Sequence, residues 1–409
     1  MATDITLVTV GLSVLVLGLL SGVLRKSMLS ESLAALIAGI ILGPAVLGVL
    51  EVGDLRDPVI EEVTRFTLAI GLMGVALRLP PRQPSRQARS LAVVVILVMP
   101  VMCLVTAVFV HLFLGLPWWI SFLIGAVLAP TDPVIVSTVV TSQLAERHVP
   151  SRIRNLLSAE SGFNDGLGVP LVLLPLFLVT VPSLGEVGLW LLQVFGFEIL
   201  GGAALGVLGG LAAGWILKWV DRHNAIEKSS LLAYALALSL LLLGLGSLAG
   251  VEPLLSVFIG GLAFDRVVTN QERKAEANVQ EAVHRFFSIP IFLLLGTALP
   301  WAAWFEMGWS ALGLALTIIL FRRLPVLIFA GRLMPDLQGT KDRLFVGWFG
   351  PMGVGSIYLA GLAYRKSGYE EVLAVAVLLV AVSVLVHSVT AAPWARRFNT
   401  GQSLAPASR

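Results

Sequence analysis

Long apolar runs follow one another through almost the whole chain. Because a helix needs about 20 apolar residues to cross the hydrocarbon of a bilayer, the runs predict about thirteen membrane spans. Only 13% of the residues are charged, against about 25% in soluble globular domains. The sequence therefore predicts an all-α, multi-pass membrane protein, with spans at residues 5–24, 30–50, 59–78, 90–112, 117–142, 152–181, 187–217, 229–249, 252–265, 284–299, 308–331, 342–364 and 371–394.

The positions of the basic residues predict how the chain is oriented. If the connection that holds Arg25 and Lys26 is cytoplasmic, strict alternation of the spans puts most of the 28 Lys and Arg residues on the cytoplasmic side. The connections on the other side contain only Arg56, Arg365 and Lys366. Cytoplasmic connections carry an excess of basic residues, so we expect the N-terminus outside and the C-terminus inside.

The spans predict a single membrane domain over residues 1–394, followed by a short cytoplasmic tail at 395–409. The first span has its basic residues after the apolar run, and we expect it to stay as an anchor. The domain divides into a first repeat at 5–181, a linker helix at 187–217 and a second repeat at 229–394. The connection at 266–284 is expected to form a surface helix, with a regulatory role as the alternative.

Two spans carry helix breakers near their middle. Proline lacks an amide donor and clashes with the preceding turn, so each of these spans should be a pair of half-helices. Interrupted helices at corresponding positions of two inverted repeats, each of about six helices, are typical of secondary transporters with a binding site between the half-helices. Ordinary proline kinks are the alternative for each break; the residues concerned are Pro130 and Pro133 in the fifth span and Gly350, Pro351 and Gly353 in the twelfth.

Three acids fall within predicted spans close to these features. Asp132 lies in the first break, while Glu160 and Asp165 lie in the sixth span, in the string SAESGFNDG. An acid inside a membrane helix costs roughly 2.5 to 3.5 kcal/mol, which indicates a functional site. Ser161 and Asn164 lie four residues from Asp165 and Glu160 respectively, so two polar pairs share one stretch of helix. Hard oxygen ligands of this kind favour an alkali cation, which would compete with a proton for the carboxylate.

Arg322 and Arg323 form a basic doublet near the middle of the eleventh span. An arginine at that depth normally needs an acid or free carbonyl groups as partner. We expect one of the two to pair with Glu160 or with carbonyl groups freed by the breaks. The alternative is an anchor at the membrane interface.

Three strings, PTDPVIVS, VPSRIRNLLSAESGFNDGLGVP and GWFGPMGVGS, resemble the monovalent cation/proton antiporters, in the NhaP/NHE branch with Asn-Asp at its centre. The resemblance covers almost the whole chain. It implies a homodimer of thirteen-helix protomers with crossed broken helices, in which an elevator-like movement exchanges Na⁺, Li⁺ or K⁺ for H⁺. It also implies a multi-pass protein of a prokaryotic plasma membrane that serves pH homeostasis.

The resemblance also implies roles for single residues. Asp165 would bind cation and proton in turn, and Asp132 would neutralise the half-helix dipoles. Ser161 and Thr131 would be further ligands of the monovalent cation. A structural polar network would join Asn164 and Glu160 to Arg322, the arginine that matches the family's R-x-L-x-V pattern, with Arg323 beside it.

The sequence departs from the family pattern in two places. Some members contribute a further carboxylate from the third helix, and the matching stretch at residues 70–77 has none. Many members carry an arginine where this chain has Met352, and Arg323 could compensate for the missing charge.

If Asp165 alone alternates between proton and cation, exchange is predicted to be electroneutral, because Asn164 cannot titrate. We expect no enzymatic activity, no cofactor and no nucleic-acid partner; the partners are the transported ions and the bilayer. A K⁺/H⁺ exchanger, a cation channel and an intramembrane aspartyl protease remain as alternatives. His387 is expected to serve helix packing or the ion pathway, Glu198 has no assigned role, and Cys103 is expected to be a buried apolar residue.

Overall fold

The computed structural model describes residues 8, 11–12, 15–16, 18–19, 30–50, 56, 58–80, 83–132, 135, 137–180, 183–222, 228–268 and 286–398. Most of the predicted first span therefore lies outside the described residues. So do Pro133, most of the connection at 266–284 and the tail from residue 399.

Every element in the described part of the chain is helical, as predicted. The elements are α2 (Glu31–Leu42), α3 (Pro58–Arg78), α4 (Gln83–Arg86), α5 (Ala88–Val93), η1 (Val94–Val98), α6 (Met99–Leu114), α7 (Trp118–Val127), α8 (Ser137–Val140), α9 (Gln143–His148), α10 (Ser151–Gly166), α11 (Gly168–Leu178), α12 (Leu184–Leu191), η2 (Leu192–Ile199), α13 (Leu200–Arg222), α14 (Lys228–Ala249), α15 (Pro253–Asp265), α17 (Trp301–Met307), α18 (Trp309–Phe321), α19 (Leu324–Ala330), η3 (Gly331–Leu333), α20 (Thr340–Trp348), α21 (Val354–Ser367) and α22 (Glu370–Phe398). A further helix covers Phe286–Thr297.

Four of the described helical stretches are long and apolar enough to cross a membrane unaided: Ala88–Leu114, Leu184–Val220, Trp309–Leu333 and Glu370–Phe398. Two bent pairs, α10 with α11 and Phe286–Thr297 with α17, raise the number to six. Of the other predicted spans in the described residues, 59–78 and 229–249 correspond to α3 with 21 residues and α14 with 22, and the rest correspond to shorter helices. An integral membrane protein is thus supported, whereas the number of spans, the inverted repeats and the orientation stay predictions.

Two predicted spans are broken where we expected continuous helices. The sixth span bends by 41° between α10 and α11. Pro170 in the first turn of α11 has no amide to donate to the preceding turn, which favours the break at Leu167. The eleventh span is interrupted at Arg322 and Arg323, between α18 and α19, where Arg323 has φ −120°. Pro325 lies in the first turn of α19, where its missing amide is tolerated but cannot continue α18.

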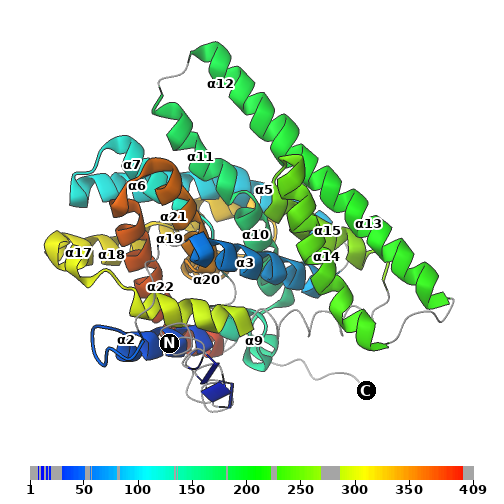
Figure 1. Ribbon diagram of the computed structural model, residues 1–409, viewed down its shortest axis with the longest axis horizontal. Coiled ribbons are helices and arrows are strands. Elements are labelled where there is room, and N and C mark those ends of the chain that lie inside the picture. Colours follow the sequence, from blue (N-terminus) through cyan, green and yellow to red (C-terminus); the bar gives the residue numbers. More distant parts are fainter. Residues whose placement is uncertain are drawn as a thin grey trace.

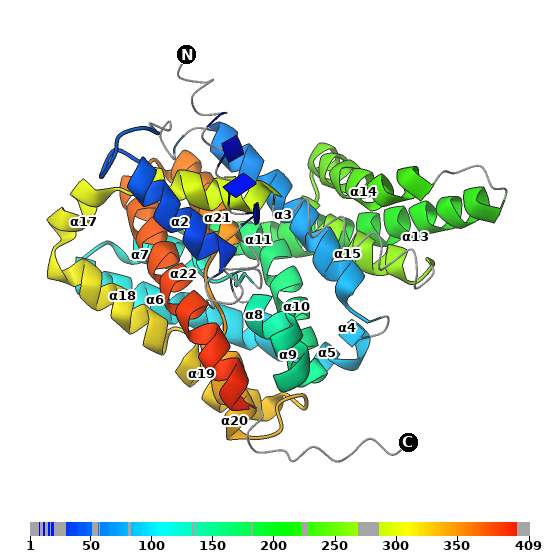
Figure 2. The same cartoon turned by 90° about the horizontal axis from the view of Figure 1, so that it is seen from below.

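The helices form two side-by-side groups. Helices α13, α14 and α15 lie on one side of the molecule, α6, α17, α18 and α22 lie on the other, and α3 and α10 lie between them (Figures 1 and 2). Helix α15 packs against α13, α14, α3 and α10. This arrangement places the sixth span, with its acids, at the junction between the two groups.

Helix α13 approaches α15 through glycines spaced four residues apart. A Cβ atom added at Gly206 would lie 2.9 Å from the main-chain nitrogen of Gly260, and one at Gly210 would lie 3.0 Å from the Cβ of Ala263. Small residues at this spacing let helix backbones come together in a bilayer, where the hydrophobic effect does not drive association. Gly206 and Gly210 form a glycine ridge on α13, and this ridge sets the distance between the two helices.

Candidate functional site

The two predicted breaks meet in space. In the fifth span, α7 ends at Val127 and α8 begins at Ser137; in the twelfth, α20 ends at Trp348 and α21 begins at Val354. Pro130 lies in the first gap, and Gly350, Pro351 and Gly353 lie in the second. The amide of Asp132 donates a hydrogen bond to the carbonyl oxygen of Pro351 at 2.8 Å, which joins the two non-helical segments directly.

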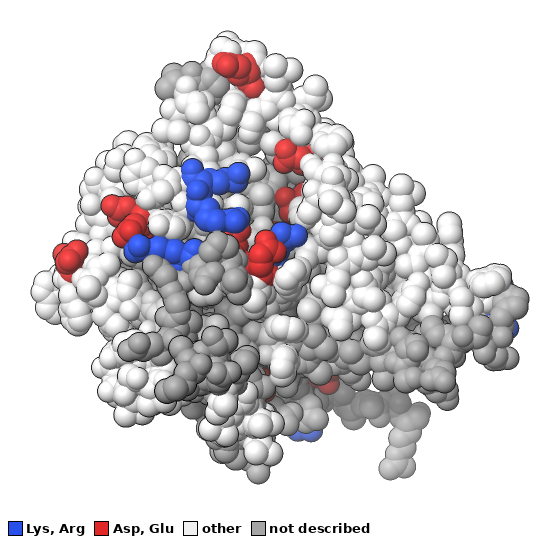
Figure 3. Space-filling view, viewed as in Figure 1, with Lys and Arg blue, Asp and Glu red and all other residues white. Residues whose placement is uncertain are grey.

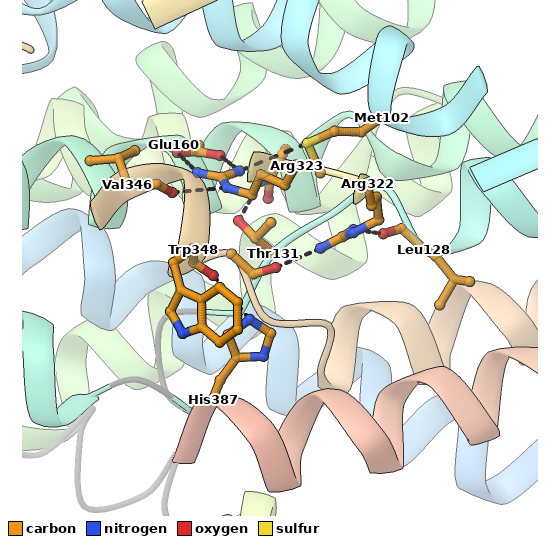
Figure 4. A network of polar contacts seen from close by, with 11 residues as sticks. Met102, Leu128, Thr131, Glu160, Arg322, Arg323, Val346, Trp348 and His387 are labelled. Carbon is orange, nitrogen blue, oxygen red and sulfur yellow. Dashed lines mark hydrogen bonds and ion pairs between the residues drawn. The ribbon is translucent and has the colours of Figure 1, made fainter. Parts of the chain in front are cut away.

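Charged side chains compensate the ends of the half-helices. Arg322 donates to the carbonyl oxygens of Leu128 and Gly350, the latter at 2.5 Å, and these carbonyls follow the C-terminal ends of α7 and α20 (Figure 4). The Oδ2 atom of Asp132 accepts from the amide of Val354 at 3.1 Å, at the first residue of α21. A cation at helix C-termini and an anion at a helix N-terminus both oppose the helix dipole.

The partner of Glu160 is Arg323, whereas the family pattern led us to expect Arg322. Arg323 donates to both carboxylate oxygens of Glu160, with Nη2 to Oε2 at 2.9 Å, and its Nε donates to the carbonyl of Val346 at 3.0 Å (Figure 4). Both side chains of the pair are almost fully buried. The two arginines point in different directions because α18 ends between Phe321 and Arg323, so Arg322 reaches freed carbonyls and Arg323 reaches the acid.

Asp165 and Asn164 lie beside the first break. The amide nitrogen of Asn164 donates to the hydroxyl of Thr131 at 2.8 Å, so Asn164 contacts Thr131 and not Glu160 as we had expected. Asp165 is 9% exposed, and Asp132 lies close enough to act on its charge. Ser161, one helical turn earlier, is also buried. The structure thus gathers the predicted ligands Asp165, Ser161, Thr131 and Asp132 around the crossing of the two broken helices.

Two oxygen atoms at this crossing are buried without a hydrogen-bond partner among the described residues. They are Oδ1 of Asp165 and Oδ1 of Asn164. The two neighbouring arginines already have other partners, since Arg322 binds carbonyl groups and Arg323 binds Glu160. Buried acceptors without partners are costly.

Helix α22 contributes to the polar network through His387, which the sequence had assigned to helix packing or the ion pathway, and through Ser383, which the sequence had not singled out. Ser383 accepts from the amide of Met352 at 2.9 Å, and Nε2 of His387 lies 3.0 Å from the carbonyl oxygen of Trp348 (Figure 4). Helix α22 therefore satisfies main-chain groups of the second break. The available signal was the spacing of Ser383 and His387, two polar residues four apart in an apolar span. His387 lies in this packing contact.

Glu198 and Glu252 are acids away from the crossing. The amide of Glu252 donates to the carbonyl of Glu198 at 3.0 Å, which joins η2 to the start of α15. Glu198 is half-buried and accepts from Gln193, whereas Glu252 is almost completely buried. Sequence reasoning passed over Glu252 because it stands at the boundary of a predicted span.

Two crossed, interrupted helices with a buried carboxylate between charge-compensated half-helix ends define this protein as a membrane transporter of the antiporter fold. The chain belongs to the transmembrane sodium/hydrogen exchanger family, whose model matches residues 11–397. The resemblance seen in the sequence is thereby confirmed.

Named relatives and a solved structure agree with this assignment. The chain is 33% identical over 366 residues to a Na⁺/H⁺ antiporter of Schizosaccharomyces pombe. The aligned region covers 86% of this chain and 78% of the relative. It is 33% identical over 343 residues to Na⁺/H⁺ antiporter 2 of Zygosaccharomyces rouxii, covering 81% of this chain but 42% of that protein. The chain thus spans less than half the length of some of its relatives.

The fold is similar to that of the sodium proton antiporter MjNhaP1 from Methanocaldococcus jannaschii at pH 8. The TM-score is 0.75 at 20% sequence identity, with 96% of this chain and 100% of that chain covered. At this identity the likeness shows the fold alone. These relatives are transporters by name, in line with the expectation that the chain is no enzyme.

Proposed function

We propose that this protein exchanges a monovalent cation for protons across a membrane, with Asp165 binding the two in competition. The observation that carries the proposal is the buried Oδ1 atom of Asp165, which has no hydrogen-bond partner among the described residues. A desolvated carboxylate without a fixed counter-ion is stabilised either by a proton or by a cation, and a second bound cation would repel the first. Competition for one carboxylate couples the two fluxes.

The residues around Asp165 suit a partly dehydrated alkali cation as substrate. Asn164 Oδ1 is a second buried acceptor, and Ser161 and Thr131 add hydroxyl and carbonyl oxygens nearby. Oxygen ligands of this type favour hard cations. Asp132, engaged by the amide of Val354, would set the local field and compensate the helix end rather than bind the ion alone.

Sodium is the favoured cation. The relatives that share 33% identity with the chain are named as Na⁺/H⁺ antiporters, whereas a protein of Shewanella oneidensis named as a K⁺/H⁺ antiporter is 28% identical over 295 residues. An exchanger for K⁺ with the same mechanism is the second candidate. A channel fits less well, because the acids and arginines of the crossing are buried and Glu160 is held by Arg323.

The mechanism that we propose is alternating access by an elevator-like movement in a homodimer. The part of the protein that contains the crossed helices would move against a second part. This second part consists of α13, α14 and α15 together with α3, which packs on α15. The fungal and bacterial relatives do not place the chain in a prokaryotic plasma membrane, and that location remains a prediction.

Substitution of Asp165 tests the central claim. In proteoliposomes with an imposed pH gradient, addition of Na⁺, Li⁺ or K⁺ should dissipate the gradient for the wild type. Asp165→Asn keeps the shape but cannot exchange a proton, and we expect the rate to fall at least about a hundredfold. Glu198→Gln, which removes an acid from a half-buried position away from the crossing, serves as control. Wild-type rates from Asp165→Asn would reject the proposal.

A further inference from the structure

Charged residues gather where α3 begins and where α21 ends. On the face seen in Figure 3, basic side chains cluster near the middle, with acidic side chains on either side of them. Two ion pairs join the elements there. Arg365 at the end of α21 binds Glu61 on α3, and Arg56 binds Glu370 at the start of α22 at 3.0 Å. Arg56 lies two residues before α3 and Glu61 lies in its first turn, so the two pairs join the start of α3 to the end of α21 and the start of α22.

The two pairs differ in burial. The side chains of Arg56 and Glu370 are 43% and 63% exposed, so their pairing is weak and screened by salt. In the other pair, Arg365 is 44% exposed but Glu61 only 6%. The carboxylate of Glu61 is therefore enclosed, while the guanidinium that binds it has open space on its outer side.

Glu61 lines a small, partly open cavity between three helices. The cavity is bordered by Glu61 and Thr64 of α3, by Ile357 and Gly361 of α21, and by Val377 of α22. Glu61 and Gly361 are close, because a Cβ atom added at Gly361 would be in van der Waals contact with Glu61 Oε2, at 3.4 Å. Glu61 thus faces α21 directly.

One face of α3 connects this cavity with Asp165. Glu61, Thr64 and Leu68 are spaced by three and four residues and so share a face. At the inner end of that face, the Cδ2 atom of Leu68 and the Oδ1 atom of Asp165 both border Gly355 of α21, at 3.8 and 2.5 Å from the position of an added Cβ. Thr64 and Leu68 are fully buried, so the route from the surface to Asp165 is closed on this face.

We propose that Glu61 is the receiving site for the transported cation on this face, and that Arg365 is its gate. The proposal rests on the proposed function and extends it from the central site to the entrance. A buried carboxylate needs a positive partner, and the guanidinium and an incoming cation would compete for the same oxygens. In the closed state the guanidinium of Arg365 binds the carboxylate of Glu61. When α21 moves relative to α3, Arg365 swings into solvent and Glu61 takes the cation before it passes Thr64 and Leu68 to Asp165.

The test is exchange measured from each side of the membrane, in vesicles of known orientation. Glu61→Gln should raise the KM for Na⁺ about tenfold at the face that carries the connection between α21 and α22, and leave the KM at the opposite face unchanged. Arg365→Gln removes the competitor and should lower the KM at that face severalfold. The double variant should behave as Glu61→Gln does.

Glu370→Gln and Arg56→Gln are matched controls, because they remove the same charges from the exposed pair. Each should change the KM less than about twofold. The face is identified with Lys366→Cys and a membrane-impermeant maleimide, since the single native cysteine, Cys103, is buried. Thermal unfolding in detergent checks that Glu61→Gln folds. Arg365→Gln tests the proposal independently, because its KM for Na⁺ should fall whereas that of Glu61→Gln should rise.

Three results would overturn the proposal. The first is an equal rise in KM at both faces for Glu61→Gln, which indicates a general structural effect. The second is the same rise in Glu370→Gln, which indicates surface charge alone. The third is a raised KM in Arg365→Gln. Failure of the proposed function is distinguishable, because it would leave exchange intact in Asp165→Asn whatever the behaviour of Glu61.

Discussion

At the scale of single residues, two neighbouring arginines compensate two different kinds of negative group. Arg322 binds main-chain carbonyls at the ends of two half-helices, and Arg323 binds the carboxylate of Glu160. The sequence predicted that a cation at this depth needs such partners, because an unpaired charge in a membrane is costly. It could not assign the partners, since that depends on where α18 ends.

Removal of Arg323 should destabilise the protein. In Arg323→Ala the carboxylate of Glu160 stays buried without its partner, and breaking a buried pair in this way costs about 3 to 5 kcal/mol. Thermal unfolding in detergent should show a clearly lower midpoint. Arg332→Ala, at an exposed arginine of η3, is the control and should change little.

The double variant Glu160→Leu with Arg323→Met distinguishes the loss of the whole ion pair from the burial of one unpaired charge. It removes both charges, so we expect it to unfold at a higher temperature than Arg323→Ala does. Equal midpoints for the wild type and Arg323→Ala would contradict a stabilising role of the ion pair.

At the scale of elements, the breaks in the helices decide where chemistry can occur. Pro130, Pro351 and the neighbouring glycines identified two interruptions in advance, because their effect on the backbone is local. The bend at Leu167 had a local signal as well, in Pro170, but the apolar run continues through it and concealed the break. The extent of each gap and the hydrogen bond between Asp132 and Pro351 depend on packing between distant segments.

The contact of α13 with α15 gives a prediction at this scale. In Gly210→Leu a side chain would enter the space held by Gly260 and Ala263, and overpacking of this kind costs about 1 to 3 kcal/mol. The unfolding midpoint in detergent should fall. Gly244→Leu in α14 is the matched control, because an added Cβ there meets nothing within 4 Å, and leucine favours the helix over glycine. A midpoint unchanged in Gly210→Leu would mean that the ridge does not set the contact.

At the scale of the whole molecule, the arrangement of charges predicts how transport responds to voltage. Glu160 is paired with Arg323, Asp132 accepts from the amide of Val354, and Asn164 cannot titrate. In the proposed function Asp165 is the group that exchanges proton for cation. The loaded site then has the same net charge in both half-cycles. We therefore expect one-for-one, electroneutral exchange.

The measurement is the rate of exchange in liposomes at a fixed pH gradient, with the membrane potential varied. An electroneutral exchanger should keep its rate, while each net charge moved would add about 2.3 kcal/mol of driving force per 100 mV. A protonophore in empty liposomes serves as control for the applied potential. A rate or an end point that follows the potential would exclude the one-for-one scheme.

The sequence by itself determined that the chain is helical and embedded in a membrane, located two of the interrupted stretches, and placed Asp132, Glu160 and Asp165 inside apolar spans. These features depend on the length of an apolar run, on the effect of proline on the backbone and on the cost of burying a charge. Each of these effects is local, so a short stretch of sequence is enough to predict it. Only the tertiary structure decided that Arg323 and not Arg322 holds Glu160, that Asn164 binds Thr131, and that Glu61 faces α21. Those pairings join residues far apart in the chain, and they depend on the directions in which packed helices point their side chains.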